Sequence, residues 1–174
     1  MASNDYHFIT HWRVESTLRE ITEILGNGVD MARWWPAVYL EVKQLKQGDA
    51  NGMGIVYDLY TKGWLPYTLR WKAETKATNH PFGYSIQATG DFEGEGTWTF
   101  EQDSAYVNVT YDWKLRADKP ILKNFSFIMK PLFGANHRWA MRKGEESLKL
   151  ELLRRHASSP EERARIPAPP PATP

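Results

Sequence analysis

The 174-residue chain contains no cysteine, and this absence removes several kinds of site at once. The protein has no disulfide, no thiolate nucleophile and no cysteine-based zinc or iron–sulfur centre. An excess of charge is missing too, because 22 basic and 21 acidic residues leave a net charge of +1. A chain without excess positive charge has no general attraction to a phosphate backbone, so we expect no nucleic-acid partner.

Long hydrophobic runs are also missing. No stretch reaches the roughly 18 consecutive apolar residues that indicate a membrane-spanning helix, so we expect no membrane insertion. The first residues do not join a basic segment to an apolar one, as a secretory signal does, and we expect a cytoplasmic protein. We find no Gly-rich phosphate loop, nucleophile elbow or helical pair of metal-binding histidines, and we therefore expect no metal and no cofactor.

The chain does contain enough apolar residues for one hydrophobic core. A hydrophobic fraction of 41% suits a single domain, which we place at residues 1–156. Residues 157–174 consist mostly of proline, alanine, serine and charged side chains. This composition is typical of a disordered or polyproline-like tail.

Alternation of apolar and polar side chains predicts seven strands in an antiparallel sheet. In residues 5–15, for example, Tyr6, Phe8 and Trp12 share one face. The pattern recurs at the close spacing of a meander, at residues 38–45, 53–62, 66–75, 82–92, 94–102 and 106–116. Each strand has an apolar and a polar face, which is typical of a sheet covered on one side.

Two short helices are predicted between the first and second strands. Ser16 or Thr17 provides an N-cap for the first helix, and Glu20 provides the partner of a capping box. The second helix covers about residues 29–34, because Pro36 disfavours helical geometry at the residue before it.

A long helix is predicted at about residues 132–155. Pro131 sets its beginning, since a proline kinks or breaks a helical segment near Lys130. One stripe of the helix is mostly apolar or small and contains one histidine; its residues are Phe133, His137, Ala140, Met141, Gly144, Leu148 and Leu152. The helix is about 36 Å long and seven strands span about 34 Å, so one helix covers the whole apolar face of the sheet.

The element order resembles the helix-grip fold of the SRPBCC, or START-like, superfamily over about residues 5–155. Within it, Trp34-Trp35-Pro36 and Asn136-His137-Arg138-Trp139 leading into Gly144-Glu145-Glu146 are similar to the polyketide cyclase/dehydrase and lipid-transport branch. The resemblance implies an α+β fold with a curved sheet wrapped around the C-terminal helix. It also implies a deep cavity for a lipid, sterol or polyketide. Carriers, sensors and enzymes share this scaffold, so the resemblance does not decide the chemistry.

Large side chains on several strands and on the long helix face the expected cavity. Each aromatic residue offers an apolar body, and tyrosine and tryptophan add a polar tip that orients a ligand. Gly144 costs about 1 kcal/mol relative to alanine inside a helix, which indicates close approach by a ligand or by a bulky tryptophan. The candidate ligand-binding residues are Tyr67, Trp71, Tyr84, Trp98, Tyr111, Trp113, Phe133, His137, Met141 and Gly144. For any one of them, simple core filling is the alternative.

His137 is the leading candidate for catalysis, because an imidazole exchanges protons near neutral pH and this one lies on the inward stripe. A structural role in the core is the alternative for His137. Tyr84 and Tyr111 are the other candidate acids or bases. His80 lies in a turn that flanks the entrance of a cavity in this architecture. Arg138 lies at the edge of the stripe, where it either meets a ligand carboxylate or faces solvent.

The leading hypothesis is binding of a hydrophobic small molecule, of lipid, polyketide, aromatic or isoprenoid-like type, between the sheet and the C-terminal helix. The alternative is a cofactor-independent cyclase or dehydratase that acts on such a ligand by acid/base catalysis. A third hypothesis is protein interaction through the proline-rich tail and Trp139, which lies opposite the inward stripe. The sequence leaves the oligomeric state, monomer or dimer, open.

Overall fold

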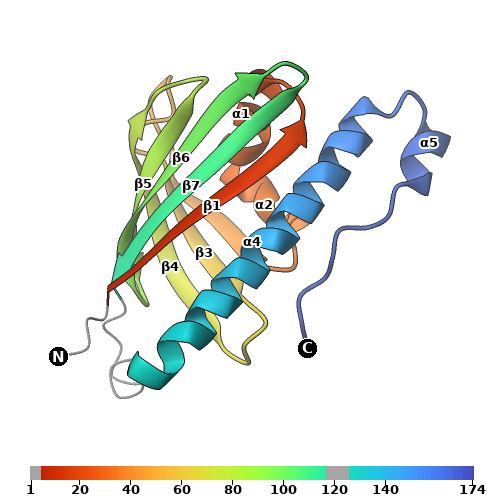
Figure 1. The fold of residues 1–174 in the computed structure, drawn as a ribbon. Coiled ribbons are helices and arrows are strands. Elements are labelled where there is room, and N and C mark those ends of the chain that lie inside the picture. The colour runs from red at the N-terminus through yellow and green to blue at the C-terminus, as the bar shows by residue number, and fades with distance from the viewer. Residues whose placement is uncertain (1–4, 117–125) are drawn as a thin grey trace.

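The computed structural model describes residues 5–116 and 126–174 (Figure 1). Seven antiparallel strands form one curved sheet, and the long helix α4 lies across its concave face. In chain order the elements are β1 (Asp5–Glu15), α1 (Leu18–Gly26), the 3-10 turn η1 (Gly28–Asp30), α2 (Met31–Trp34), β2 (Tyr39–Lys46), β3 (Val56–Lys62), β4 (Thr68–Thr78), β5 (Gly83–Gly90), β6 (Glu93–Asp103), β7 (Tyr106–Arg116), α4 (Ser126–His156) and α5 (Pro160–Arg165). The predicted α+β architecture is confirmed.

The first strand of the chain pairs with the last, and β1 and β2 are the two edge strands of the sheet. Its order is β1-β7-β6-β5-β4-β3-β2, and every pair of neighbours is antiparallel. Strands β1 and β7 have the predicted bounds, whereas β3 begins at Val56, after a loop, rather than at residue 53. Apolar side chains alternate onto the concave face, where Trp12, Phe100 and Val109 are buried in the core.

The two short helical segments predicted after β1 are confirmed. Thr17 caps α1 through a capping box: its hydroxyl accepts from the N–H of Glu20, and the Glu20 carboxylate accepts from the N–H of Thr17. The turn η1 and helix α2 then bring Trp34 and Trp35 into the core, where both are almost fully buried. The short helices therefore supply two indoles on which α4 packs.

Among the described residues, α4 runs from Ser126 and contains Pro131, so the helix extends before the predicted beginning at about residue 132. Pro131 therefore does not end the helical segment, although a proline inside a helix removes one backbone hydrogen bond. The C-terminal segment, residues 157–174, includes a further short helix. Ser159 caps the short helix α5, and near the C-terminus Thr173 accepts a hydrogen bond from Lys62 at 2.8 Å.

Gly144 lets α4 approach α2 closely. A Cβ at this position would overlap the indole ring of Trp35. Gly144 lines neither of the two cavities described below, so the structure does not support its prediction as a ligand-binding residue. The side chain that approaches Gly144 closely is therefore a tryptophan.

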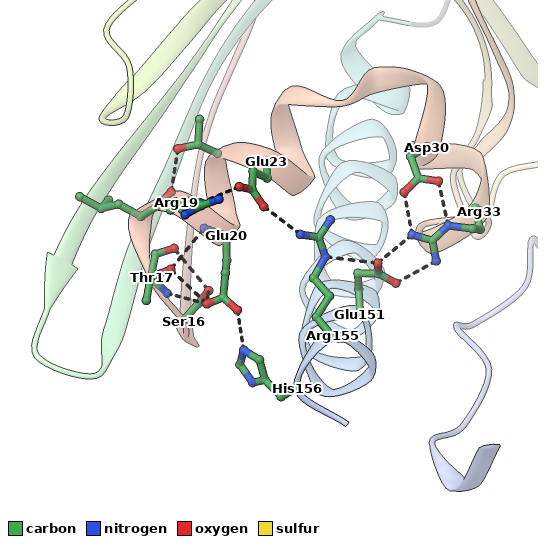
Figure 2. A network of polar contacts seen from close by, with 12 residues as sticks. Ser16, Thr17, Arg19, Glu20, Glu23, Asp30, Arg33, Glu151, Arg155 and His156 are labelled. Carbon is green, nitrogen blue, oxygen red and sulfur yellow. Dashed lines mark hydrogen bonds and ion pairs between the residues drawn. The ribbon is translucent and has the colours of Figure 1, made fainter. Parts of the chain in front are cut away.

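A polar network fastens the C-terminal half of α4 to α1 and α2 (Figure 2). Arg33 donates to both carboxylate oxygens of Glu151, at 2.9 and 2.7 Å, and to Asp30 at 2.6 Å. The Glu151 side chain is only 6% exposed, and its second cation, Arg155, is more distant at 3.6 Å. The network continues to α1 through His156 with Glu20 at 2.6 Å and Arg155 with Glu23 at 3.3 Å.

Replacing Arg33 by methionine leaves the buried Glu151 carboxylate with Arg155 alone. Loss of one partner from a buried pair is strongly destabilising, although Arg33 is itself 53% exposed, so we expect the free energy of unfolding to fall by about 2 kcal/mol. The control is Arg19→Met, which removes an exposed pair with Glu23 and is expected to leave the free energy of unfolding almost unchanged, because solvent screens that pair. Urea unfolding measures both variants, and equal effects would contradict a structural role for the Arg33–Glu151 pair.

Candidate ligand-binding site

A cavity of about 180 Å³ lies between the N-terminal half of α4 and the concave face of the sheet. Eight of the ten predicted ligand-binding residues line it, and these are Tyr67, Trp71, Trp98, Tyr111, Trp113, Phe133, His137 and Met141. The structure adds residues that the sequence analysis did not select, chiefly Tyr6, Phe8, Trp35, Tyr39, Phe92, Asn136 and Ala140. Tyr6 and Phe8 lie on the inward face of β1, and the alternation of apolar and polar residues could have identified both as cavity-lining. Trp35 and Asn136 reach the cavity only through the packing of α2 and α4.

A second cavity of about 260 Å³ lies between the α1–η1–α2 segment and strands β3 to β5. Tyr39, Trp71, Trp98 and Tyr111 line both cavities, so these four side chains stand between the two chambers. His80, predicted to flank an entrance, lines the second cavity and not the first. The interior of the fold is therefore two chambers with an aromatic partition.

Tyr84, predicted as a candidate acid or base and as a ligand-binding residue, lines the second cavity and not the one that contains His137. Its hydroxyl donates to the carbonyl oxygen of Leu25 at 2.8 Å, and burial raises the pKa of its phenol. A hydroxyl that is already engaged by α1 and that resists ionisation serves to hold the helix on the sheet. The structure thus gives Tyr84 a positioning role.

The wall between the chambers is built from stacked rings. The Trp98 and Tyr111 rings lie 4.0 Å apart at 18°, and Tyr111 and Trp113 lie 5.5 Å apart at 21°. Trp71 meets Trp113 at 5.9 Å, and its Nε1 donates to Thr61 at 3.0 Å. Offset and tilted rings of this kind present flat apolar faces with few free polar atoms. The wall therefore favours flat or ring-containing molecules.

His137 is neutral in this environment. Its ring stacks on Phe8 at a centroid distance of 4.3 Å, and its Nε2 is buried with no hydrogen-bond partner among the described residues. Burial, with a smaller contribution from the positive charge of Arg138, lowers the pKa of His137 to about 4. At neutral pH the imidazole is thus a potential hydrogen-bond partner or a base, and it carries no positive charge.

Tyr111 contributes a phenol to the same cavity. Burial raises the pKa of Tyr111 well above its ordinary value, so the hydroxyl stays protonated. The described residues provide no hydrogen bond to this hydroxyl, and it lies over Gly96, where a Cβ would come within 2.6 Å of it. A neutral imidazole and a protonated phenol are therefore the polar groups most available to a ligand in this cavity.

One edge of the first cavity is formed where the β3–β4 loop meets α4. The side-chain oxygen of Asn136 accepts from the backbone N–H groups of Trp64 and Leu65, at 2.8 and 3.2 Å. Gly63 passes so close to Asn136 that a side chain there would overlap it. The Thr173 hydroxyl also donates to the Gly63 carbonyl at 3.2 Å, so the end of the tail lies at this edge.

No metal centre is formed by residues 5–116 and 126–174, since no three potential ligands among their His, Asp and Glu side chains converge. His7 and His11 instead contact Asp112 and Thr110 on the outer face of the sheet, at 2.9 and 3.2 Å. None of the helices in these two ranges combines the length and the apolarity needed to cross a bilayer.

Comparison with known proteins identifies the fold. No family model and no curated sequence matches the chain, but solved structures do. The Zhui aromatase/cyclase from Streptomyces sp. R1128 is 16% identical, with a TM-score of 0.67 over 88% of this chain and 97% of that chain. A START superfamily protein from Mycobacterium smegmatis is 12% identical, with a TM-score of 0.55 over 76% of this chain and 97% of that one. The chain has the START-like helix-grip fold.

A third structural neighbour is norcoclaurine synthase from Thalictrum flavum, solved in complex with dopamine and hydroxybenzaldehyde. It is 13% identical, with a TM-score of 0.58 over 91% of each chain. At these identities the likeness concerns the fold, and the predicted helix-grip architecture is confirmed. Ligand and chemistry depend on the side chains of this chain.

The buried imidazole makes stability depend on pH. The unfolded chain takes up a proton at His137 below about pH 6.5, whereas the folded protein does so only near pH 4, so folding stability falls as pH drops through this window. We expect wild type to lose on the order of 3 kcal/mol more than His137→Phe between these limits, because phenylalanine preserves the stack on Phe8 without titrating. Denaturant unfolding at several pH values measures the difference, and parallel curves for the two proteins would refute it.

Proposed function

We propose that this protein binds an apolar, ring-containing small molecule between its sheet and α4. The observation that carries the proposal is the cavity itself, which is walled by stacked aromatic rings and holds a neutral His137 and a protonated Tyr111. Apolar walls with a few convergent polar groups are the usual composition of a small-molecule site. A tightly packed core would leave no such space.

The size of the two chambers restricts the ligand. Neither chamber alone reaches the roughly 300 Å³ at the lower end of typical ligand pockets, but the two together do. The partition of Tyr39, Trp71, Trp98 and Tyr111 consists of rings that can rotate about their side-chain bonds. An elongated ligand therefore occupies both chambers and lies against these rings, and a compact one occupies a single chamber.

The polar groups of the cavity determine which chemical group the ligand carries at the end that meets His137 and Tyr111. The unpartnered Nε2 of His137 and the Tyr111 hydroxyl satisfy their hydrogen-bonding capacity when a ligand brings a hydroxyl or a carbonyl group. Carboxylate or ammonium groups are disfavoured inside, because an apolar chamber penalises an unpaired charge. The titles of two fold neighbours, an aromatase/cyclase and a synthase complexed with dopamine and hydroxybenzaldehyde, support a ligand with aromatic character.

Filling the cavity tests this function. Ala140 lines the first chamber, and Ala140→Phe places a ring in that space. We expect at least a tenfold loss of affinity for aromatic and acyl probes, measured by fluorescence titration, and loss of any ligand that mass spectrometry finds co-purified with the wild type. The control is Ala164→Phe on the exposed surface of α5, which should bind like the wild type. Unchanged binding by folded Ala140→Phe would contradict a site in this chamber.

A second candidate function is cofactor-independent cyclisation or dehydration in the same cavity. It is favoured because His137 and Tyr111 both line the first chamber in protonation states suited to such chemistry. Neutral His137 removes a proton from the carbon next to a ligand carbonyl, while Tyr111 donates a hydrogen bond to the carbonyl oxygen. When the resulting enolate expels a β-hydroxyl group, the proton returns to that leaving oxygen and water departs.

Turnover of a β-hydroxy aryl ketone, followed by the absorbance of its conjugated product, tests the enzyme hypothesis. We expect His137→Phe to lower the rate by about 10² to 10⁴ while ligand affinity changes far less, because the proton transfer is lost and the ring volume is kept. Tyr111→Phe should lower the rate without changing the shape of the cavity. A full rate in His137→Phe would remove the histidine from the mechanism, and binding without turnover in wild type would leave ligand binding as the function.

A further inference from the structure

Basic residues gather on the half of α4 that covers the first cavity. From Ser126 to Gly144 this helix has no acidic residue, whereas its basic residues there are Lys130, Arg138, Arg142 and Lys143. Acidic residues resume at Glu145. The chain as a whole is nearly neutral at +1, so the charge is unevenly distributed along the molecule. An uneven distribution of this kind creates a local positive field at one end of the fold.

The two arginines among these basic residues line an open groove on the outer side of α4. The groove is formed by Trp64 from the β3–β4 loop together with Ala135, Arg138, Trp139 and Arg142 from the helix. Arg138 and Arg142 are exposed and lie on one helix face at a spacing of four residues. Neither forms an ion pair with any described residue, unlike Arg13, Arg33 and Arg70.

The groove adjoins the first cavity. Asn136 lines that cavity and also accepts the backbone N–H of Trp64, which lines the groove. Gly63, the residue before Trp64, lines the cavity as well. A surface that docks in the groove therefore lies beside the part of the cavity wall that Gly63 and Asn136 form.

We propose that this groove docks on the surface of an anionic lipid bilayer, with headgroup phosphates on Arg138 and Arg142. The indoles of Trp64 and Trp139 then lie at the headgroup level, where an aromatic ring with a polar edge is most stable. The proposal rests on the proposed function, because a carrier of apolar molecules exchanges them where they are soluble. Docking of this kind is peripheral and needs no membrane-spanning segment.

Charge complementarity distinguishes a lipid surface from other occupants. Guanidinium groups bind phosphate in a bidentate manner, and two unpaired ones four residues apart match an array of anionic headgroups without any specific partner sequence. Each basic residue near such a surface strengthens binding about fivefold, so loss of two arginines is expected to weaken it about thirty-fold. The interaction is also expected to weaken steeply with salt.

Vesicle co-sedimentation of the full chain tests the proposal. We expect the wild type to bind phosphatidylcholine vesicles that contain phosphatidylserine, and to bind vesicles of phosphatidylcholine alone far more weakly. The variant R138Q/R142Q should bind the anionic vesicles about thirty-fold more weakly. The matched control is R163Q/R165Q, which removes the same charge from exposed positions on α5 and should stay within about twofold of the wild type.

Two results would overturn the proposal: failure of the wild type to bind anionic vesicles at low salt, or an equal loss in both double variants. The first result would point to an acidic protein as the occupant of the groove. Trp64→Ser should also weaken vesicle binding, which a purely electrostatic attraction would not show. Ala140→Phe separates the two proposals, since a filled cavity abolishes ligand binding and leaves the groove intact.

Discussion

The packing of α4 on Trp35 at Gly144 decides how the helix lies on the sheet. On the C-terminal side of this contact the helix is held tightly, with Leu148 and Leu152 buried and Glu151 bound to Arg33. On the N-terminal side it covers the first cavity, and Asn136 holds the β3–β4 loop beside it. One helix thus completes the core at one end and encloses a chamber at the other.

The aromatic interior then determines the chemistry that is available. Burial among stacked rings lowers the pKa of His137 and raises that of Tyr111, because a low-dielectric environment disfavours both charged forms. The same residues therefore offer neutral hydrogen-bonding groups at physiological pH. The guanidinium groups of Arg138 and Arg142, which pair with no described residue, lie on the exposed side of α4. An apolar interior beside a basic rim combines a site for a hydrophobic molecule with a surface for anions.

Local sequence patterns predicted the elements of the fold but not every position in the site. The alternation in residues 5–15 gave the bounds of β1, and the capping box at Thr17 follows from chemistry confined to four residues. Tyr84 shares the inward phase of its strand with Ile86 and was for that reason assigned to the same cavity wall as the other aromatic residues. The structure places it in the other chamber, because α1 crosses above it and supplies the Leu25 carbonyl.

By itself the sequence determined the strands, the short helices and the apolar stripe of the long helix, since each depends on periodicities within about ten residues. Tertiary structure alone decided that Gly144 receives Trp35 and that four aromatic side chains divide the interior. It also decided that Trp64 and Trp139 share a groove with two arginines that pair with no described residue. These outcomes depend on contacts between residues distant in the chain, and a sequence pattern carries no information about which distant surfaces will meet.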